Sequence, residues 1–147
     1  TLIQTWLTVG PNHYGASSMV QVKITGCAPQ LNPVKYQLSD IIHSCLQDAI
    51  GTPENKRFQR FFPLEAEDFY YPSDRSKQYT IIEIMMFEGR SIPAKKKLTR
   101  LLFERINQQI GIAVEDIEIV MFELPKHNWG IRGVPGDELV LNYVVEA

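Results

Sequence analysis

The side chains best suited to chemistry on a small anion are two arginines. Arg90 follows the apolar run 79–87 and precedes a predicted helix. In open α/β sheets, ligands bind beyond the carboxyl ends of the strands, and helix amino-termini favour anions. Arg90 could therefore bind a carboxylate, or it could be a solvated arginine near a helix start. Arg57, at the start of another predicted strand, could reach the same crevice or lie only on the surface.

One histidine and one tryptophan are further candidates. A histidine titrates near neutral pH and can shuttle protons, so His127 is a candidate catalytic residue, with an ordinary loop histidine as the alternative. Trp129 could cover an edge of the core or line a pocket. His43 lies beside the apolar stripe of a predicted helix, which favours packing over ligand binding.

Two clusters of side chains carry weaker signals. The run of three lysines at 95–97 is spread around a helix axis, which predicts a solvated face. The aromatic residues 69–71 could line a pocket, form a subunit contact or cap the end of a sheet. Neither cluster selects a function by itself.

Several classes of site and partner are disfavoured by what the sequence lacks. The three histidines and two cysteines show no metal-ligand spacing, and no phosphate-binding glycine loop or nucleophile elbow occurs, so we expect no metal and no cofactor. A net charge of −2 gives no overall attraction to nucleic acid or membrane. No stretch approaches the roughly 20 apolar residues that span a bilayer. Reduced thiols and no signal-peptide pattern predict a cytoplasmic location.

The elements that position these residues come from an internal repeat. A shift of 60 positions aligns the two halves without a gap from Val20 to Phe62. The matched pairs include Ile24/Ile84, Pro33/Pro93, Lys35/Lys95, Leu38/Leu98, Ile50/Ile110, Gly51/Gly111 and Phe62/Phe122. Such a repeat indicates two copies of one structural unit.

Each copy predicts a strand, a helix and a second strand. Residues 20–25 alternate in polarity, residues 38–50 carry an apolar stripe at helical spacing, and residues 57–62 form the second strand. The other copy places these elements at 79–87, 98–110 and 117–124. Parallel strands joined by a helical crossover predict an α/β (α+β) fold, a four-stranded sheet with two helices on one face. The uncovered face predicts an oligomer.

We therefore predict one domain over residues 1–147. It comprises an amino-terminal extension at 1–18, the first β-α-β unit at 19–62, the second at 79–124, and a turn followed by an edge strand at 129–145. Residues 65–76 form an insertion between the units.

Three segments carry a resemblance to a known family. They are the junction Phe87-Glu88-Gly89-Arg90-Ser91, the segment from Pro53 to Gln59, and the segment from Glu123 to Gly130, which ends in Asn128-Trp129-Gly130. Together with the two fused β-α-β units, they resemble the tautomerase superfamily, and within it the branch with two units in one chain. That branch includes the malonate semialdehyde decarboxylases and the cis-3-chloroacrylic acid dehalogenases. The resemblance covers roughly residues 19–133.

The resemblance implies a homotrimer whose active site lies at the start of the first strand. There the family's amino-terminal proline supplies an amine that acts as base or acid, and nearby arginines bind the substrate carboxylate. In this sequence Val20 occupies the proline position, directly after Met19. If translation begins at Met19, a terminal amine titrating near 7.7–8.0 could act as the base. If residues 1–18 are native, position 20 offers only an amide.

Two further departures argue against malonate semialdehyde decarboxylase activity. Lys56 stands where that enzyme has a carboxylate, before the arginine that aligns with Arg57. Glu88 replaces the first arginine of a pair whose second member is Arg90.

Two functional hypotheses follow. The first is a tautomerase-like enzyme that acts on a small carboxylate or keto acid by proton transfer or hydration. Its candidate catalytic residues are Val20 and His127, and its candidate substrate-binding residues are Arg90, Arg57 and Trp129. The second is a non-enzymatic ligand-binding or interaction module on the same fold.

Overall fold

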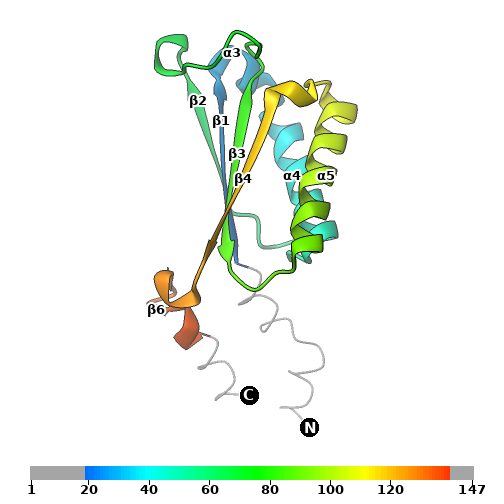
Figure 1. Ribbon diagram of the computed structural model, residues 1–147. Helices are drawn as coiled ribbons and strands as arrows, with labels where there is room; N and C mark the ends of the chain where they lie inside the picture. Colours follow the sequence, from blue (N-terminus) through cyan, green and yellow to red (C-terminus); the bar gives the residue numbers. More distant parts are fainter. Residues whose placement is uncertain (1–18, 140–147) are drawn as a thin grey trace.

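A computed structural model describes residues 19–139, in which two long helices cover one face of a sheet (Figure 1). The strands are β1 (Val20–Cys27), β2 (Gln59–Leu64), β3 (Thr80–Phe87), β4 (Ile117–Leu124), β5 (Gly130–Ile131) and β6 (Val134–Pro135). The helical elements are α3 (Ala28–Leu31), η1 (Asn32–Val34), α4 (Lys35–Ile50), η2 (Ala66–Asp68), α5 (Ile92–Ile110), η3 (Val114–Asp116) and η4 (Lys126–Asn128), where η marks a 3-10 helix.

The two predicted β-α-β copies are present, and their elements keep the shift of 60. Strands β1 and β3 begin at Val20 and Thr80 and share one alternation of buried and half-buried residues. Helices α4 and α5 end at Ile50 and Ile110, and β2 and β4 end at Leu64 and Leu124. The repeat is therefore a structural repeat as well as a sequence repeat.

The sequence also fixes where both helices end. Gly51 and Gly111 follow the last helical residues with φ of 71° and 77°, the left-handed conformation that glycine adopts without a steric penalty. Pro93 lies in the first turn of α5, where proline is tolerated, and the Ser91 hydroxyl accepts a hydrogen bond from the Ala94 N–H. Its repeat counterpart Pro33 lies instead in η1, before α4 begins.

The sheet has the order β2-β1-β3-β4, with parallel pairing inside each copy and antiparallel pairing of β1 with β3 between them. In that central ladder Lys23 faces Glu83, and these two residues are also equivalent under the repeat. An approximate two-fold axis therefore passes between them. It places the starts of β1 and β2 at the same end of the sheet as the ends of β3 and β4.

Strand β2 begins later than the sequence pattern predicts. Pairing with β1 starts at the Phe58 carbonyl, which accepts a hydrogen bond from the Val22 N–H at 2.9 Å. Arg57 is instead directed to α4, where its guanidinium forms an ion pair with Asp40 at 2.6 Å. His43, buried on α4 as the apolar stripe predicted, makes a hydrogen bond through Nε2 to the Glu54 carbonyl in the loop that follows α4.

One face of the sheet packs against the helices, as predicted. The core there is built from alternating strand residues and from the helix stripes, including Val22, Ile24, Ile82, Ile84, Leu38, Ile42, Leu98 and Leu102. The opposite face, here called the open face, carries Gln21, Lys23, Thr25, Arg60, Phe62, Ile81, Glu83, Met85, Glu118, Val120 and Phe122. Three of its apolar residues, Phe62, Val120 and Phe122, are 37–43% exposed.

The segment after β4 begins with the turn that the sequence indicated. Strands β5 and β6 form a hairpin whose two turn residues, Arg132 and Gly133, have φ of 52° and 85°, as a type I′ turn requires. Residues 136–139 are helical, so Leu139 does not begin the predicted strand. Residues 140–145 of that prediction lie outside the described part of the chain, as does the extension at 1–18.

The glycine that follows α5 allows a test of how this helix ends. We expect Gly111→Ala to lower the free energy of unfolding by about 1–2 kcal/mol, the cost of a left-handed conformation for an L-residue, because the space for its Cβ is open. Gly130→Ala is the control, because Gly130 has equal space and no positive φ. Its free energy of unfolding should stay within about 0.5 kcal/mol of wild type in urea denaturation. Equal losses for the two variants would contradict this account of the helix end.

Candidate functional site

The predicted site residues gather at one end of the sheet, because β1 and β3 run in opposite directions. Val20, the first residue of β1, pairs with Met86 near the end of β3. Phe87 pairs in turn with Leu124 at the end of β4. The junction from β3 to α5, which carries Arg90, and the turn that carries Trp129 therefore both lie at this end, below the helices in Figure 1.

Arg90 is a partly buried cation supported by the backbone. Gly89 before it has φ of 122°, a conformation that glycine permits and that turns the chain from β3 into α5. The Arg90 Nη1 group donates a hydrogen bond to the Phe87 carbonyl at 3.2 Å. Burial lowers the pKa of Arg90, and the negative charge of Glu123 opposes this shift. A desolvated guanidinium of this kind favours an anionic ligand.

Lys95 and Glu123 add an ion pair beside Arg90. The Lys95 Nζ lies 2.6 Å from the Glu123 Oε1, and both side chains are only about a quarter exposed, at 25% and 28%. The lysine run at 95–97 is therefore not a uniformly solvated face, because Lys95 turns toward β4 while its two neighbours remain exposed. The sequence held one signal for this pair. Glu123 continues the alternation that places Ile119 and Met121 on the helix side of β4.

Trp129 covers the edge of the core. Its ring packs edge-to-face on fully buried Phe87, with ring centroids 5.2 Å apart. The Trp129 carbonyl accepts a hydrogen bond from the Gly136 N–H at 2.6 Å. A Cβ at Gly136 would lie 2.5 Å from the Lys126 carbonyl oxygen, so this close approach requires glycine. His127 lies in η4, exposed to solvent, two residues before the tryptophan.

Arg57 and Arg90 flank the start of β1 on opposite sides. Arg57 lies on the β2 side, where its guanidinium contacts Asp40 at 2.6 Å and the Ser39 hydroxyl at 3.2 Å. It borders an open hollow of about 260 Å³, whose other lining residues are Gln21, Phe58, Gln59 and Arg60. Its charge is therefore already engaged by an aspartate, whereas Arg90 lies on the β3 side of the sheet.

Val20, the first residue of β1, lies between these two sides, because β1 is flanked by β2 and β3. Its side chain is only 3% exposed and belongs to the core. Its nitrogen is the part that the family resemblance implicates, and in the sequence as printed that nitrogen is bonded to Met19.

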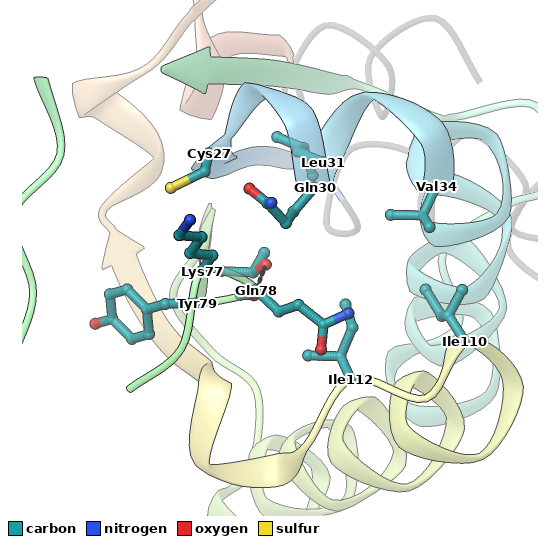
Figure 2. Close-up of a pocket in the computed structure, with 10 residues that line it drawn as sticks. Cys27, Gln30, Leu31, Val34, Lys77, Gln78, Tyr79, Ile110 and Ile112 are labelled. Atoms are coloured by element: carbon teal, nitrogen blue, oxygen red, sulfur yellow. Dashed lines mark hydrogen bonds between the residues drawn. The ribbon is translucent and has the colours of Figure 1, made fainter. Parts of the chain in front are cut away.

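The other end of the sheet holds the repeat counterpart of this site (Figure 2). A cavity of about 20 Å³, room for a single water molecule, is lined there by residues that include Cys27, Gln30, Lys77 and Thr80. Under the shift of 60, Gln30 corresponds to Arg90 and Thr80 to Val20. The second end therefore has a neutral carboxamide where the candidate site has a guanidinium.

The aromatic residues whose role the sequence left open belong to this second end. The rings of Phe69, Tyr71 and Tyr79 pack with centroids 5.5–5.6 Å apart. Tyr79 donates a hydrogen bond to Glu118 at 2.9 Å, and buried Asp116 accepts one from the Ser76 N–H at 2.7 Å. Phe69 and Tyr71 therefore pack with Tyr79 at this end of the sheet, whereas Tyr70 is 89% exposed.

Among residues 19–139, no group of three or more histidine, cysteine, aspartate or glutamate side chains is arranged to hold a metal ion. Within the same range, no helix combines the length and the apolar character needed to cross a bilayer.

Comparisons with known proteins agree with this geometry. Residues 56–132 match the family described as "Tautomerase enzyme". The probable tautomerase YusQ of Bacillus subtilis is 26% identical over 98 residues, which cover 63% of this chain and 77% of YusQ. A malonate semialdehyde decarboxylase structure has a TM-score of 0.72 at 20% identity, covering 84% of this chain and 98% of its own. An asymmetric trimer of R7 fused 4-OT has a TM-score of 0.72 at 17% identity, covering 81% and 98%. The predicted fold and the resemblance to two-unit tautomerases are confirmed.

Proposed function

The chain belongs to the tautomerase enzyme family, and from that premise we propose that it binds a small carboxylate or keto acid through Arg90. The observation that carries this proposal is the partly buried guanidinium, which is anchored by the Phe87 carbonyl and has no carboxylate within 4 Å among residues 19–139. Trp129 would line one side of the ligand. Arg57 would assist only from across β1, because Asp40 already engages it.

The reaction we propose is proton transfer between carbon and oxygen of an enol or keto acid. One proton leaves the substrate and one returns, so the step needs no redox partner and no organic cofactor. The group that moves the proton would be a terminal amine at residue 20, because this position begins β1 between the two arginines. With Met19 attached, that nitrogen is an amide and is not basic, and we expect weak or altered activity.

A second candidate function is a non-enzymatic ligand-binding or interaction module. The observation that favours it is the same peptide bond, because it leaves the anion-binding end intact while removing the amine. In either case Glu88 and Lys56 replace groups of the decarboxylase pattern, so we do not propose decarboxylation.

We further propose that the chain assembles as a homotrimer through the open face. This face exposes Phe62, Val120 and Phe122, and the fused 4-OT relative with the same fold is a trimer. We also propose a cytoplasmic location, because Cys27 and Cys45 are unpaired thiols, as a reducing compartment maintains them.

The assembly is tested by light scattering at micromolar concentration. We expect wild type to have three times the mass of the chain, and Phe122→Asp to shift the protein toward monomer, because a charge would be buried between subunits. Tyr36→Asp is the matched control, since Tyr36 is 90% exposed on the helical layer and should leave the trimer intact. A monomeric wild type would refute the proposal.

Ligand binding is tested by calorimetry with pyruvate. Arg90→Ala should weaken binding by about 1.5–3 kcal/mol, the range for a hydrogen bond to a charged group. Arg100→Ala, which removes an exposed guanidinium from α5, the helix that follows Arg90, should leave the affinity unchanged. Equal affinities for wild type and Arg90→Ala would remove Arg90 from the site.

Catalysis is tested by comparing the full chain with a version that begins at Val20, both assayed on phenylenolpyruvate. The full chain should be nearly inactive, whereas the shorter chain exposes an amine. The nearby cation disfavours protonation and should hold the amine's pKa below its usual 7.7–8.0. Because only the neutral amine is a base, the rate should rise with pH through that lowered pKa. Strong activity in the full chain, lost in His127→Ala, would show that His127 is the base instead.

A further inference from the structure

Glu123 is a carboxylate placed between two cations. Its Oε1 lies 2.6 Å from the Lys95 Nζ, and its charge also acts on Arg90, whose pKa it raises against the effect of burial. It stands at the end of β4 as the ladder partner of Met86, one residue before β3 ends at Phe87, and Arg90 is the third residue after that end. The three charged groups therefore share one corner of the sheet.

Glu123 forms its ion pair with Lys95 and not with Arg90. A guanidinium presents two parallel N–H groups to a carboxylate, a geometry that the ammonium of lysine cannot match. Glu123 nevertheless contacts Lys95, while Arg90 donates to the Phe87 carbonyl. A carboxylate that paired with Arg90 would occupy the donors that a substrate carboxylate needs.

Lys95 is fixed well enough to hold Glu123. It is the fourth residue of α5, its N–H donates to the Ser91 carbonyl at 3.1 Å, and its own carbonyl accepts from the Thr99 hydroxyl at 3.1 Å. The ammonium therefore projects from a capped helix end toward β4, and its position does not depend on a loop.

The repeat gives an independent observation. The counterpart of Lys95 is Lys35, but the counterparts of Glu123 and Arg90 are Pro63 and Gln30. The first copy thus keeps the lysine where it has neither an arginine nor a competing carboxylate. The full set of three charges occurs only at the end of the sheet where an anion receptor is proposed.

We propose that Lys95 is a positioning residue that holds Glu123 away from Arg90 and so keeps the guanidinium open for a substrate carboxylate. This inference rests on the proposed function, in which Arg90 is the receptor. Lys95 itself does not touch the ligand in this account. Lys95 affects ligand binding only through Glu123. A second substitution, at Glu123, should therefore cancel the effect of removing Lys95.

The test measures pyruvate affinity by calorimetry in a matched set of variants. Lys95→Met keeps the length of the side chain and removes its charge, and it should weaken binding about ten-fold, because Glu123 then pairs with Arg90. Lys95→Arg should bind as wild type does. The double variant Lys95→Met/Glu123→Gln should regain most of the lost affinity, a rescue that a merely structural role would not produce. Lys97→Met, an exposed neighbour, is the control.

Two outcomes would overturn the inference: unchanged affinity in Lys95→Met, or a double variant as weak as the single one. A crystal structure of Lys95→Met gives a readout that does not depend on the ligand. It should show Glu123 within 4 Å of Arg90, and a Glu123 that stays apart from Arg90 would also refute the inference. If wild type binds no pyruvate, the proposed function fails, while the contact between Glu123 and Arg90 still tests the role of Lys95.

Discussion

The antiparallel pairing of β1 with β3 is the constraint on which the rest of the structure depends. Each β-α-β copy alone would place its strand starts at one end and its strand ends at the other. Joining the copies about an axis between Lys23 and Glu83 brings the start of one copy beside the end of the other. Residue 20 thereby comes to lie at the same end as the junction that carries Arg90. The meeting of residue 20 from the first copy with Arg90 from the second is a consequence of this pairing.

The same pairing creates two equivalent ends, and the chain uses them differently. One end holds Arg90, Lys95 and Glu123, three charged groups whose formal charges sum to +1, in a partly buried corner. At the other end, packed aromatic rings and buried Asp116 cap the sheet beside a cavity of about 20 Å³, the size of a water molecule. Gln30 stands there at the position equivalent to Arg90, so this end lacks the guanidinium of the proposed anion receptor. The architecture therefore occurs twice in the chain, while the residues proposed to bind a ligand occur at one end.

Much of this fold could be predicted from sequence, because periodicity and the repeat report backbone geometry directly. The shift of 60, the glycine caps and the bounds of β4 are all visible in the order of residue types. What failed depended on tertiary contacts. Arg57 leaves the strand pattern because Asp40 binds it. Lys95 was misjudged for the same reason, because helical phase alone gives no information about a carboxylate on a strand 28 positions later.

The electrostatics of the candidate site connect binding to catalysis. A partly buried guanidinium is costly to desolvate, and a bound carboxylate offsets that cost more effectively than a carbonyl does. Under the proposed function, the same cation would also shift an amine at the start of β1 toward its neutral, basic form. An internal carboxylate that neutralised Arg90 would therefore weaken both effects at once. Pairing Glu123 with a lysine resolves this conflict, because the carboxylate is satisfied without using the guanidinium. In the proposed function, the binding of an anion and the basicity of a neighbouring amine would thus both depend on where the Glu123 side chain is held.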